Sequence, residues 1–392
     1  MFNHPTPVHL TLITASLAWA VNSHAVGFRL PNQDPEGIAR GNAFVATADN
    51  PSAIYYNPAG ISQLQGQHFQ AGLYYVSAST RYTSPTGASA KTDTTFQPVP
   101  QMYYVRSFED KPFTLGIGVY APYGLSLDYG ENNPFNFIAE YGKLAYATVN
   151  PVIAWKATPE LSLAIGPTLN YSQATLVNNV LRYKGDGMAF GFNAGVLWQP
   201  HEQWSFGATY RSATKVEYKG NAEIFDTFRS QSTADFQFPQ FAVIGVSYRP
   251  TPNWNFEFNL DWTDWDNVNQ TVFRDTAIGD LPFIFNYKTS FMYEFGITRK
   301  LKNGWFVSTG YFYSENSSPD ANFNPIVPDA NLHLGSAGFG RKGERFDWVV
   351  AYHFGYGPGR TVTGSPVVAG QSGDGRYRTF NNAVNISLNY KF

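Results

Sequence analysis

The chain lacks cysteine altogether, and only 14% of its 392 residues are charged. The missing cysteine excludes a disulfide scaffold and a thiol-dependent enzyme, and soluble domains usually carry roughly 25% charged residues. The longest apolar run extends only from Leu10 to Val21, well short of the ~20 residues that a membrane-spanning helix needs. A formal net charge of -2 gives no electrostatic reason to expect a nucleic-acid partner.

What the chain does have is aromatic side chains, since 32 Phe, 25 Tyr and 9 Trp make up 17% of it. This content excludes intrinsic disorder. The mean hydropathy is nevertheless -0.28, so polar residues must be interspersed with the aromatic ones. These properties indicate an aromatic-rich β protein with a surface that faces lipid.

Apolar and polar residues alternate from about residue 68 to the end of the chain. Between Trp254 and Trp262, aromatic residues and a leucine occupy one face, while Asn, Glu and Asp occupy the other. Residues 161–171 and 346–354 alternate in the same way. Because successive side chains of a strand point to opposite faces, each segment predicts a strand with one apolar face.

About fourteen such runs follow one another, joined alternately by short turns, such as residues 109–112, and by long loops, such as residues 125–142 and 220–235. This is the pattern of an outer-membrane barrel. The sequence therefore predicts an all-β fold, a transmembrane antiparallel β-barrel of about 14 strands over residues 67–392. A sandwich or propeller is the alternative, but the polar faces would make a poor sandwich core, and no repeat of 20–50 residues supports a propeller.

The last expected strand ends the chain on an aromatic residue. Val384, Ile386, Leu388, Tyr390 and Phe392 share one face. This arrangement resembles the C-terminal signal of bacterial outer-membrane barrels. The resemblance implies that the barrel-assembly machinery is a partner and that it recognises Phe392.

The apolar run near the N-terminus is interpreted as part of a signal peptide, residues 1–25, with cleavage after Ala25 or, as second choice, Ala20. No Lys or Arg precedes Arg29, and a buried strand or a disordered terminus is the alternative. Residues 26–66 do not alternate, yet they contain many apolar side chains. They predict a hatch, or plug, folded inside the barrel, with a small periplasmic module as the alternative.

Several motifs in this segment resemble the hatch of the FadL/TodX family of outer-membrane transporters of long-chain fatty acids and hydrocarbons. The motifs are Val26-Gly-Phe-Arg-Leu30, Gly37-Ile-Ala-Arg-Gly-Asn-Ala43, Ala46-Thr-Ala-Asp-Asn-Pro-Ser52 and Tyr56-Asn-Pro-Ala-Gly60. Barrel segments such as residues 192–197 and 261–265 are also similar to family patterns. The resemblance spans nearly the whole mature chain and implies a fourteen-stranded barrel with an N-terminal hatch.

The resemblance implies passive import of hydrophobic compounds. A groove among the external loops captures the solute, an interior pocket binds it, and a lateral opening at a kinked third strand releases it into the bilayer. Phe135, Phe137 and Ile138 form an apolar loop cluster that we expect to be exposed as the capture groove. Packing of loop against loop is the alternative for these side chains.

The lateral opening is assigned to Pro122, Tyr123 and Gly124, because proline removes a ladder donor and glycine weakens a strand. A turn at the end of a short strand is the alternative. By resemblance, Asn57-Pro58-Ala59 would sit against this kink and hold it open. Phe28 and Leu30 would border the interior pocket.

Recognition of a fatty-acid carboxylate is where the sequence departs from the family. The resemblance implies a basic group in the lumen, and Arg182 is the nearest candidate. After Pro328-Asp329-Ala330, where an arginine is expected, the chain has Asn331. This departure leaves room for a neutral hydrocarbon or another lipophilic ligand as well as a fatty acid.

No enzyme, cofactor or metal site is expected. The histidines are scattered, and neither a nucleophile elbow nor a phosphate-binding loop is present. The alternative function is an outer-membrane barrel enzyme or adhesin with an internal plug. Besides hydrophobic small molecules, we expect outer-membrane lipid and lipopolysaccharide as partners, and a monomer in the bacterial outer membrane.

Overall fold

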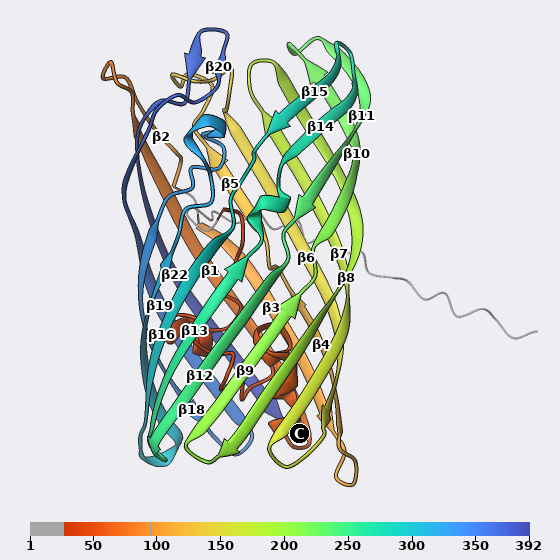
Figure 1. Ribbon diagram of the computed structural model, residues 1–392, viewed down its shortest axis with the longest axis vertical. Coiled ribbons are helices and arrows are strands. Elements are labelled where there is room, and N and C mark those ends of the chain that lie inside the picture. The colour runs from red at the N-terminus through yellow and green to blue at the C-terminus, as the bar shows by residue number, and fades with distance from the viewer. Residues whose placement is uncertain (1–26, 95) are drawn as a thin grey trace, which may run out of the picture.

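The computed structural model describes residues 27–94 and 96–392, so the predicted signal peptide, residues 1–25, lies outside the described residues. Most of the described chain forms one antiparallel sheet. The sheet closes because β1 (Gln67–Thr83) pairs with β3 (Phe96–Ser107) and with the last strand, β22 (Gly375–Lys391). The closed antiparallel barrel of fourteen strands in Figure 1 confirms the predicted fold class.

Each crossing of the barrel wall is one long strand or two segments separated by a break. The other long strands are β6 (Tyr141–Lys156), β7 (Leu161–Val177), β8 (Leu181–His201), β17 (Trp305–Ser314), β18 (Leu332–Lys342) and β19 (Phe346–Val362). The segmented crossings are β4 (Phe113–Tyr120) with β5 (Gly124–Asp128), β9 (Trp204–Arg211) with β10 (Thr214–Ile224), β11 (Phe228–Phe238) with β12 (Phe241–Thr251), β13 (Trp254–Thr263) with β14 (Gln270–Thr276), and β15 (Gly279–Ile284) with β16 (Ser290–Lys300).

Short turns join the strands at one end of the barrel, which we call the short-turn end, and longer connections join them at the long-loop end (Figure 1). In outer-membrane barrels the short turns face the periplasm. The short-turn end includes η3 (Lys302–Gly304). Small elements of the other connections are β2 (Ser89–Lys91), η2 (Trp265–Asn267), η4 (Asp320–Asn322), β20 (Val367–Val368) and β21 (Gln371–Ser372).

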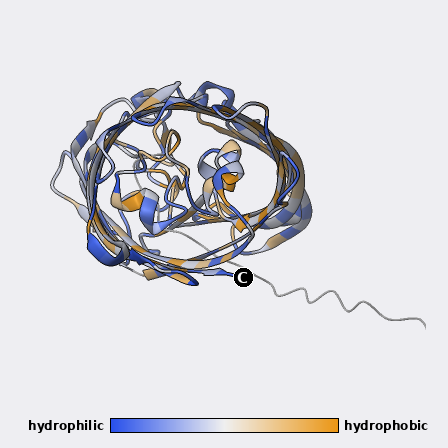
Figure 2. Ribbon diagram, turned by 90° about the horizontal axis from the view of Figure 1, so that it is seen from below, coloured by the Kyte–Doolittle hydropathy of each residue, from blue (hydrophilic) through white to orange (hydrophobic). Residues whose placement is uncertain are grey.

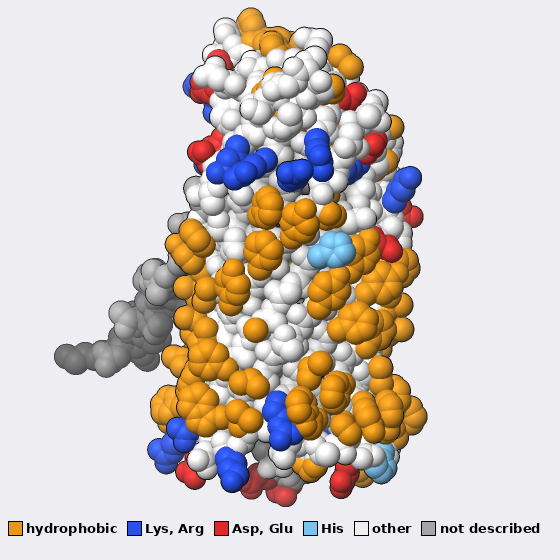
Figure 3. Space-filling view, turned by 90° about the vertical axis from the view of Figure 1, so that its left-hand side faces the viewer, with side chains coloured by type: hydrophobic (Ala, Val, Ile, Leu, Met, Phe, Trp, Pro, Cys, Tyr) orange, Lys and Arg blue, Asp and Glu red, His pale blue; other side chains and the backbone are white. Residues whose placement is uncertain are grey.

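The two faces of the wall follow the predicted alternation. In β13, Trp254 and Phe256 are exposed on the outside, whereas Glu257 and Asp261 are buried on the inside. Figure 3 shows the outward apolar side chains as a broad band on one side of the barrel. A barrel wall in lipid requires this arrangement, because its outer face contacts hydrocarbon.

Two of the expected long loops are wrong. Most of residues 220–235 form the hairpin of β10 and β11, whose connection covers only residues 225–227, and β5 occupies the start of the expected loop 125–142. In β10 the outward residues are polar, such as Lys215 and Lys219, and exposed. These segments extend beyond the lipid, so no outward apolar stripe distinguishes them from loops.

Residues 27–66, which we call the hatch, lie inside the barrel in its half near the short-turn end (Figures 1 and 2). They form α1 (Pro35–Ala39), α2 (Ala53–Tyr56) and the 3-10 helix η1 (Pro58–Gln63). α1 begins after Asp34, whose carboxylate accepts hydrogen bonds from the two backbone N–H groups of Glu36 and Gly37. In the described part of the chain, no helix has the length and apolar character needed to cross a membrane.

Glycines in the wall allow the hatch backbone to approach it closely. A Cβ atom on Gly310 of β17 would lie 2.0 Å from the backbone of Arg40 and Gly41. A Cβ atom on Gly207 of β9 would lie 2.1 Å from the carbonyl oxygen of Val45. Both distances are far below van der Waals contact, so the hatch fits the wall only where side chains are missing.

We expect Gly310→Val to displace the hatch, because overpacking of this kind costs about 1–3 kcal/mol. Hydrogen-exchange mass spectrometry should then show backbone amides around Arg40 losing protection about tenfold or more. Gly335→Val is the matched control, since a Cβ atom there meets nothing within 4 Å. Equal protection in the two variants would contradict this packing.

Candidate functional site

An apolar cavity lies inside the barrel between the hatch and the long-loop end. The space between its lining atoms, solvent at its mouth included, is about 680 Å³. Several strands, one loop and the hatch contribute to its wall. The apolar and aromatic residues that line it include Phe28, Leu125, Leu144, Leu176, Tyr183, Tyr218, Phe236, Phe273, Phe283, Phe285, Ile326 and Val327.

Phe28, at the start of the described chain, closes the cavity on the hatch side. Its ring centroid lies 4.7 Å from that of Trp265, 5.3 Å from that of Phe236 and 5.8 Å from that of Phe238, in edge-to-face arrangements. Such contacts add to the hydrophobic gain of burial. Phe28 is therefore both part of the cavity lining and an anchor of the hatch.

Two tyrosine hydroxyls beside the cavity are already hydrogen-bonded. The Tyr218 hydroxyl lies 2.7 Å from the Ser172 hydroxyl, and the Tyr183 hydroxyl donates to the carbonyl oxygen of Tyr218 at 3.3 Å. Lys143 is the one charged residue of the lining. It alternates with the buried, inward positions Gly142 and Leu144, so β6 directs its side chain to the other face.

Arg182 does not line this cavity. It lies on the outward face of β8 with its side chain 50% exposed, and its Nε atom is 3.7 Å from a carboxylate oxygen of Asp226. The neighbouring inward position is Tyr183, which is buried. The predicted basic group in the lumen is therefore absent at position 182, because the alternation of the strand turns this side chain outward.

The wall is kinked between β4 and β5, at Ala121, Pro122 and Tyr123. The hatch pairs with this break: Leu30 N donates to the carbonyl oxygen of Pro122 at 2.8 Å, and Gly124 N donates to that of Phe28 at 2.9 Å. The buried Tyr123 hydroxyl donates to the carbonyl oxygen of Pro239 across the lumen at 2.7 Å. The N-terminal segment therefore supplies part of the ladder that the wall lacks here.

Next to the kink, the wall is not joined by strand pairing. Within the described residues, β5 pairs with β6 alone, and β3 pairs with β4 only over Met102–Ser107. The preceding part of β3 contains Pro98 and Pro100. Because they lie two residues apart, their missing N–H donors face the same side of the strand. The ladder with β1 is intact, so that side faces β5.

The hatch spans this unpaired stretch with side-chain hydrogen bonds. Gln33 donates to the carbonyl oxygen of Ala121 at 2.8 Å, and Gln101 of β3 donates to that of Asn32 at 3.2 Å. Leu30 is buried in an apolar cluster with Tyr74, Val99 and other residues, outside the cavity lining. The two edges of the stretch are thus linked through the hatch.

The loop that was expected to present an exposed apolar cluster is packed instead. Phe135 is fully buried between Tyr82 and Tyr129, with ring centroids 4.9 Å from each. Ile138 is also buried, and Phe137 is half-buried. The expectation of exposure is wrong for Phe135 and Ile138, because aromatic residues of the neighbouring strand and loop provide a core for them.

Asn57-Pro58-Ala59 does not lie at the kink. The Asn57 amide donates to the carbonyl oxygens of Val45 in the hatch and Val196 of β8, at 2.8 and 2.9 Å. A Cβ atom on Gly195 would clash with Asn57 and Pro58. The motif therefore anchors the hatch to β8, and the contact predicted for it is made by residues 28–30.

Below the cavity, the interior is charged. Arg29 donates to the Asp261 carboxylate at 2.6 Å and to the Thr263 hydroxyl at 2.7 Å, and its guanidinium lies 3.6 Å from the ring centroid of Phe241. Burial by itself lowers the pKa of Arg29, but the Asp261 carboxylate and nearby tyrosines raise it above the usual value. Asp261 is thus half of a buried ion pair.

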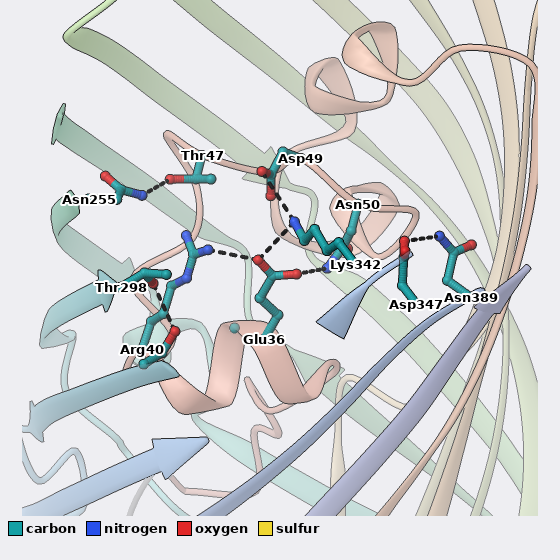
Figure 4. A network of polar contacts seen from close by, with 12 residues as sticks. Glu36, Arg40, Thr47, Asp49, Asn50, Asn255, Thr298, Lys342, Asp347 and Asn389 are labelled. Carbon is teal, nitrogen blue, oxygen red and sulfur yellow. Dashed lines mark hydrogen bonds and ion pairs between the residues drawn. The ribbon is translucent and has the colours of Figure 1, made fainter. Parts of the chain in front are cut away.

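A second polar network fastens the hatch near the short-turn end (Figure 4). Glu36 accepts from Arg40 at 2.8 Å and lies 3.2 Å from the ammonium of Lys342 on β18. Burial opposes ionisation of Asp49, but the nearby charges of Lys342 and Arg40 lower its pKa to about 2. Burial and the Glu36 charge raise the pKa of Asp34 to about 7. No group of three or more metal-ligating side chains occurs in the described ranges.

Several residues of the site carry no sequence signal that identifies them in advance. Trp265 contacts Phe28 from the break between β13 and β14, where alternation stops, and Phe236 contacts it from near the end of β11. Gln33 and Pro98 lie far apart in sequence. They come close to the kink only when the barrel has closed around the hatch. Only the Pro98-Val-Pro100 pattern could have been used to predict part of this site, since two prolines at alternate positions of a strand indicate an unpaired edge.

A fourteen-stranded barrel with an internal hatch and an apolar cavity defines a class of outer-membrane transport proteins. The model of the family described as "Outer membrane protein transport protein (OMPP1/FadL/TodX)" matches residues 15–346. The chain therefore belongs to this family, which confirms the predicted resemblance.

Individual relatives agree with this assignment. The chain is 23% identical to the long-chain fatty acid transport protein of Escherichia coli K12, with 84% of this chain and 88% of that protein covered. It is 24% identical to the 47 kDa outer membrane protein of Pasteurella multocida, with 84% and 86% covered. Among solved structures, a Pseudomonas aeruginosa FadL homologue superimposes with a TM-score of 0.84 at 17% identity, covering 93% of this chain and all of that one.

The structure of the Pseudomonas putida toluene transporter TodX superimposes with a TM-score of 0.71 at 17% identity, covering 91% of this chain and 97% of that one. At these identities the structural likeness establishes the fold. The ligand of this chain has to be argued from its own cavity.

The buried ion pair predicts the behaviour of two variants. Arg29→Met leaves the Asp261 charge buried without its partner, which costs about 3–5 kcal/mol, so amides of residues 28–34 should exchange faster. The double variant Arg29→Met/Asp261→Leu removes both charges and should recover most of the protection. Hydrogen exchange of the purified barrel tests this, and equal exchange in the single and double variants would contradict it.

Proposed function

We propose that this protein imports hydrophobic compounds passively across the outer membrane. The observation that carries the proposal is the apolar cavity, which ends at Phe28, beside the kinked wall at Tyr123. An alkyl chain in water costs about 0.8 kcal/mol per CH₂ group, so a water-filled pore gives such solutes no advantage. An apolar site inside the barrel removes most of that cost.

The proposed route has three parts. A solute enters from the long-loop end, binds in the cavity, and leaves sideways into the bilayer through the unpaired stretch between β3 and β5. Lateral release suits this stretch because fewer backbone hydrogen bonds must break there than elsewhere in the wall. Phe28, Leu30, Pro122, Tyr123 and Gly124 are the residues that we assign to the exit.

External capture takes place at the long-loop end in this proposal. Phe135 and Ile138 are buried, so capture falls to the half-buried Phe137 and to the mouth of the cavity. Asn57, Pro58 and Ala59 are assigned to holding the hatch in place against β8. This assignment makes them positioning residues rather than contacts of the solute.

For the ligand class, we propose neutral hydrocarbons, aromatic ones included, ahead of fatty acids. The inward-facing positions of the described cavity lining carry no ionised side chain. A carboxylate there would lose its hydration without gaining an ionic partner. Relatives include both a long-chain fatty acid transport protein and a toluene transporter. The choice between fatty acids and hydrocarbons therefore rests on the residues that line the cavity.

We propose a transporter rather than a barrel enzyme or adhesin, in keeping with the family. We also expect a monomer, and insertion through the C-terminal strand. Phe392 is 71% exposed on the outer face, and its N–H donates to the carbonyl oxygen of Gln67 at 3.1 Å. The residue is thus accessible on the outer face, where the assembly machinery would contact it.

Filling the cavity should abolish binding. Ala234 lines the cavity and is buried, so Ala234→Phe should weaken toluene binding more than about tenfold by occupying the space. Ala242→Phe on the outward face of β12 is the matched control. Equilibrium binding of labelled toluene and of labelled oleate to the purified, heat-modifiable barrel measures both variants. Tighter binding of oleate than of toluene by the unaltered protein would reject the proposed ligand class.

Restoring the donors of β3 should close the exit. Pro98→Thr/Pro100→Thr allows this edge to pair with β5, so uptake of labelled toluene should fall severalfold while binding to the purified protein stays unchanged. Pro151→Thr is the control, since it restores a donor in the short gap in pairing between β6 and β7, away from the kink. The assay uses cells that lack their own transporter. Unchanged uptake by the double variant would reject lateral release while leaving the cavity assignment intact.

A further inference from the structure

A row of basic side chains crosses the outside of the barrel near the long-loop end. Arg81 of β1 lies directly opposite Lys91 of β2 on one side and Arg378 of β22 on the other. Arg376 follows two residues along β22, on the same outward face, and all four residues are exposed. Figure 3, which views the side of the barrel where β1 and β22 lie, shows basic side chains gathered directly above the apolar band.

Among the described residues, no acidic side chain lies within ion-pair distance of this row. Within residues 27–94 and 96–392, none of these four side chains forms an ion pair or a hydrogen bond. Like charges directly opposite one another on adjacent strands destabilise a sheet. Elsewhere on the outer face basic residues do have acidic partners, as Lys215 has in Asp235 at 2.9 Å. The row therefore carries a cost that an external anion would offset.

The row lies at the level of the lipid head groups. Along β22 the outward aromatic residues are Phe380 and Tyr390, and Phe380 lies against Tyr356 of β19, with ring centroids 5.4 Å apart. Ten residues at about 3.4 Å each, on a strand tilted by about 40°, span roughly 25 Å, the height of the apolar band. Arg378 and Arg376 follow Phe380 on the side away from the short turns, so they face the outer leaflet.

The wall is shaped to leave room beside these arginines. The pairing of β19 with β22 shifts register between Gly357 and Arg360, and Gly359 has a φ of 99°. A Cβ atom on Gly359 would lie 3.3 Å from the Arg376 guanidinium. The bulge therefore places bare backbone, rather than a side chain, against Arg376, and leaves the guanidinium accessible from outside.

We propose that Arg81, Lys91, Arg376 and Arg378 form a binding site for the phosphate groups of lipid A, the phosphorylated and multiply acylated anchor of lipopolysaccharide. Guanidinium groups bind phosphate through paired, charge-assisted hydrogen bonds. Adjacent strands lie about 4.8 Å apart, so the cross-strand row is about 10 Å wide and can engage more than one phosphate oxygen. The acyl chains would lie on the apolar residues of β22 below, such as Val384 and Ile386.

The apolar band next to the basic row favours a lipid over other anions as the ligand. Free phosphate would use the charges alone, whereas the row continues directly into the apolar band, which suits a ligand with both a charged head and several acyl chains. The site lies on the outer surface and does not depend on the proposed import route. Loss of lipid A binding with normal toluene uptake would therefore separate the two.

The test compares Arg81→Gln/Arg378→Gln with Lys111→Gln/Lys302→Gln, which removes two exposed cations at the short-turn end. Native mass spectrometry of the purified full-length barrel measures the dissociation constant for bis-phosphorylated, hexa-acylated lipid A. We expect the first variant to weaken binding more than about tenfold and the control to change it less than twofold. Higher salt should weaken binding by the unaltered protein.

Four further measurements complete the test. Lipid A without its phosphates should bind the unaltered protein as weakly as phosphorylated lipid A binds the first variant. Inorganic phosphate alone should bind far more weakly than lipid A. Heat-dependent gel mobility verifies folding, and Lys91→Gln/Arg376→Gln provides a second variant pair. Equal weakening by the short-turn control, no weakening by either pair of the row, or phosphate binding as tight as lipid A would each overturn the proposal.

Discussion

Inside the hydrocarbon of a membrane, every backbone N–H and C=O group must find a partner within the protein, and the rest of this structure depends on that constraint. It forces the sheet to close, with β22 pairing along nearly the whole of β1. It also makes the interruption between β3 and β5 notable, because unpaired backbone there would be costly. The hatch offsets part of this cost through the backbone bonds of Phe28 and Leu30 to the kinked strand.

The hatch therefore does more than fill the lumen, since it also contacts the kinked strand and the cavity. Its first residues bond to the kinked strand at Pro122 and Gly124, and Phe28 also lines the cavity. Ion pairs and hydrogen bonds hold its remaining residues in place, such as the ion pairs of Glu36 with Arg40 and with Lys342. The lumen is thus divided into an apolar chamber near the long-loop end and a polar base near the short turns.

The strands whose outer face contacts lipid could be predicted from the sequence. β13 alternates because its outer face contacts hydrocarbon, and its limits differ little from those expected. The hairpin around residues 225–227 was missed because polar residues line its outer face, in water. Phe135 was expected to be exposed because its burial depends on Tyr82, which is distant in sequence. The orientation of Arg182 depends on strand register, which a single residue type does not determine.

The motifs of the hatch were recognisable, but their contacts were not. Asn57-Pro58-Ala59 is a local pattern, whereas its partners Gly195 and Val196 become neighbours only after the barrel closes. The same holds for Arg29 and Asp261, which lie on segments separated by most of the chain. Contacts within one strand or turn could be inferred from residue order, and contacts across the lumen could not.

The separation of these contacts also constrains the order of assembly. The hatch is the first described part of the chain, yet its backbone fits against Gly310, and its side chains pair with Lys342 on one of the last strands. Gly27 donates to the Asp329 carboxylate across 302 residues of sequence. Contacts of such long range form late, after loop closure. The hatch can therefore reach its final position only after most of the barrel strands have formed. When β1 and β22 pair and close the barrel, the hatch has not yet completed its contacts with the wall.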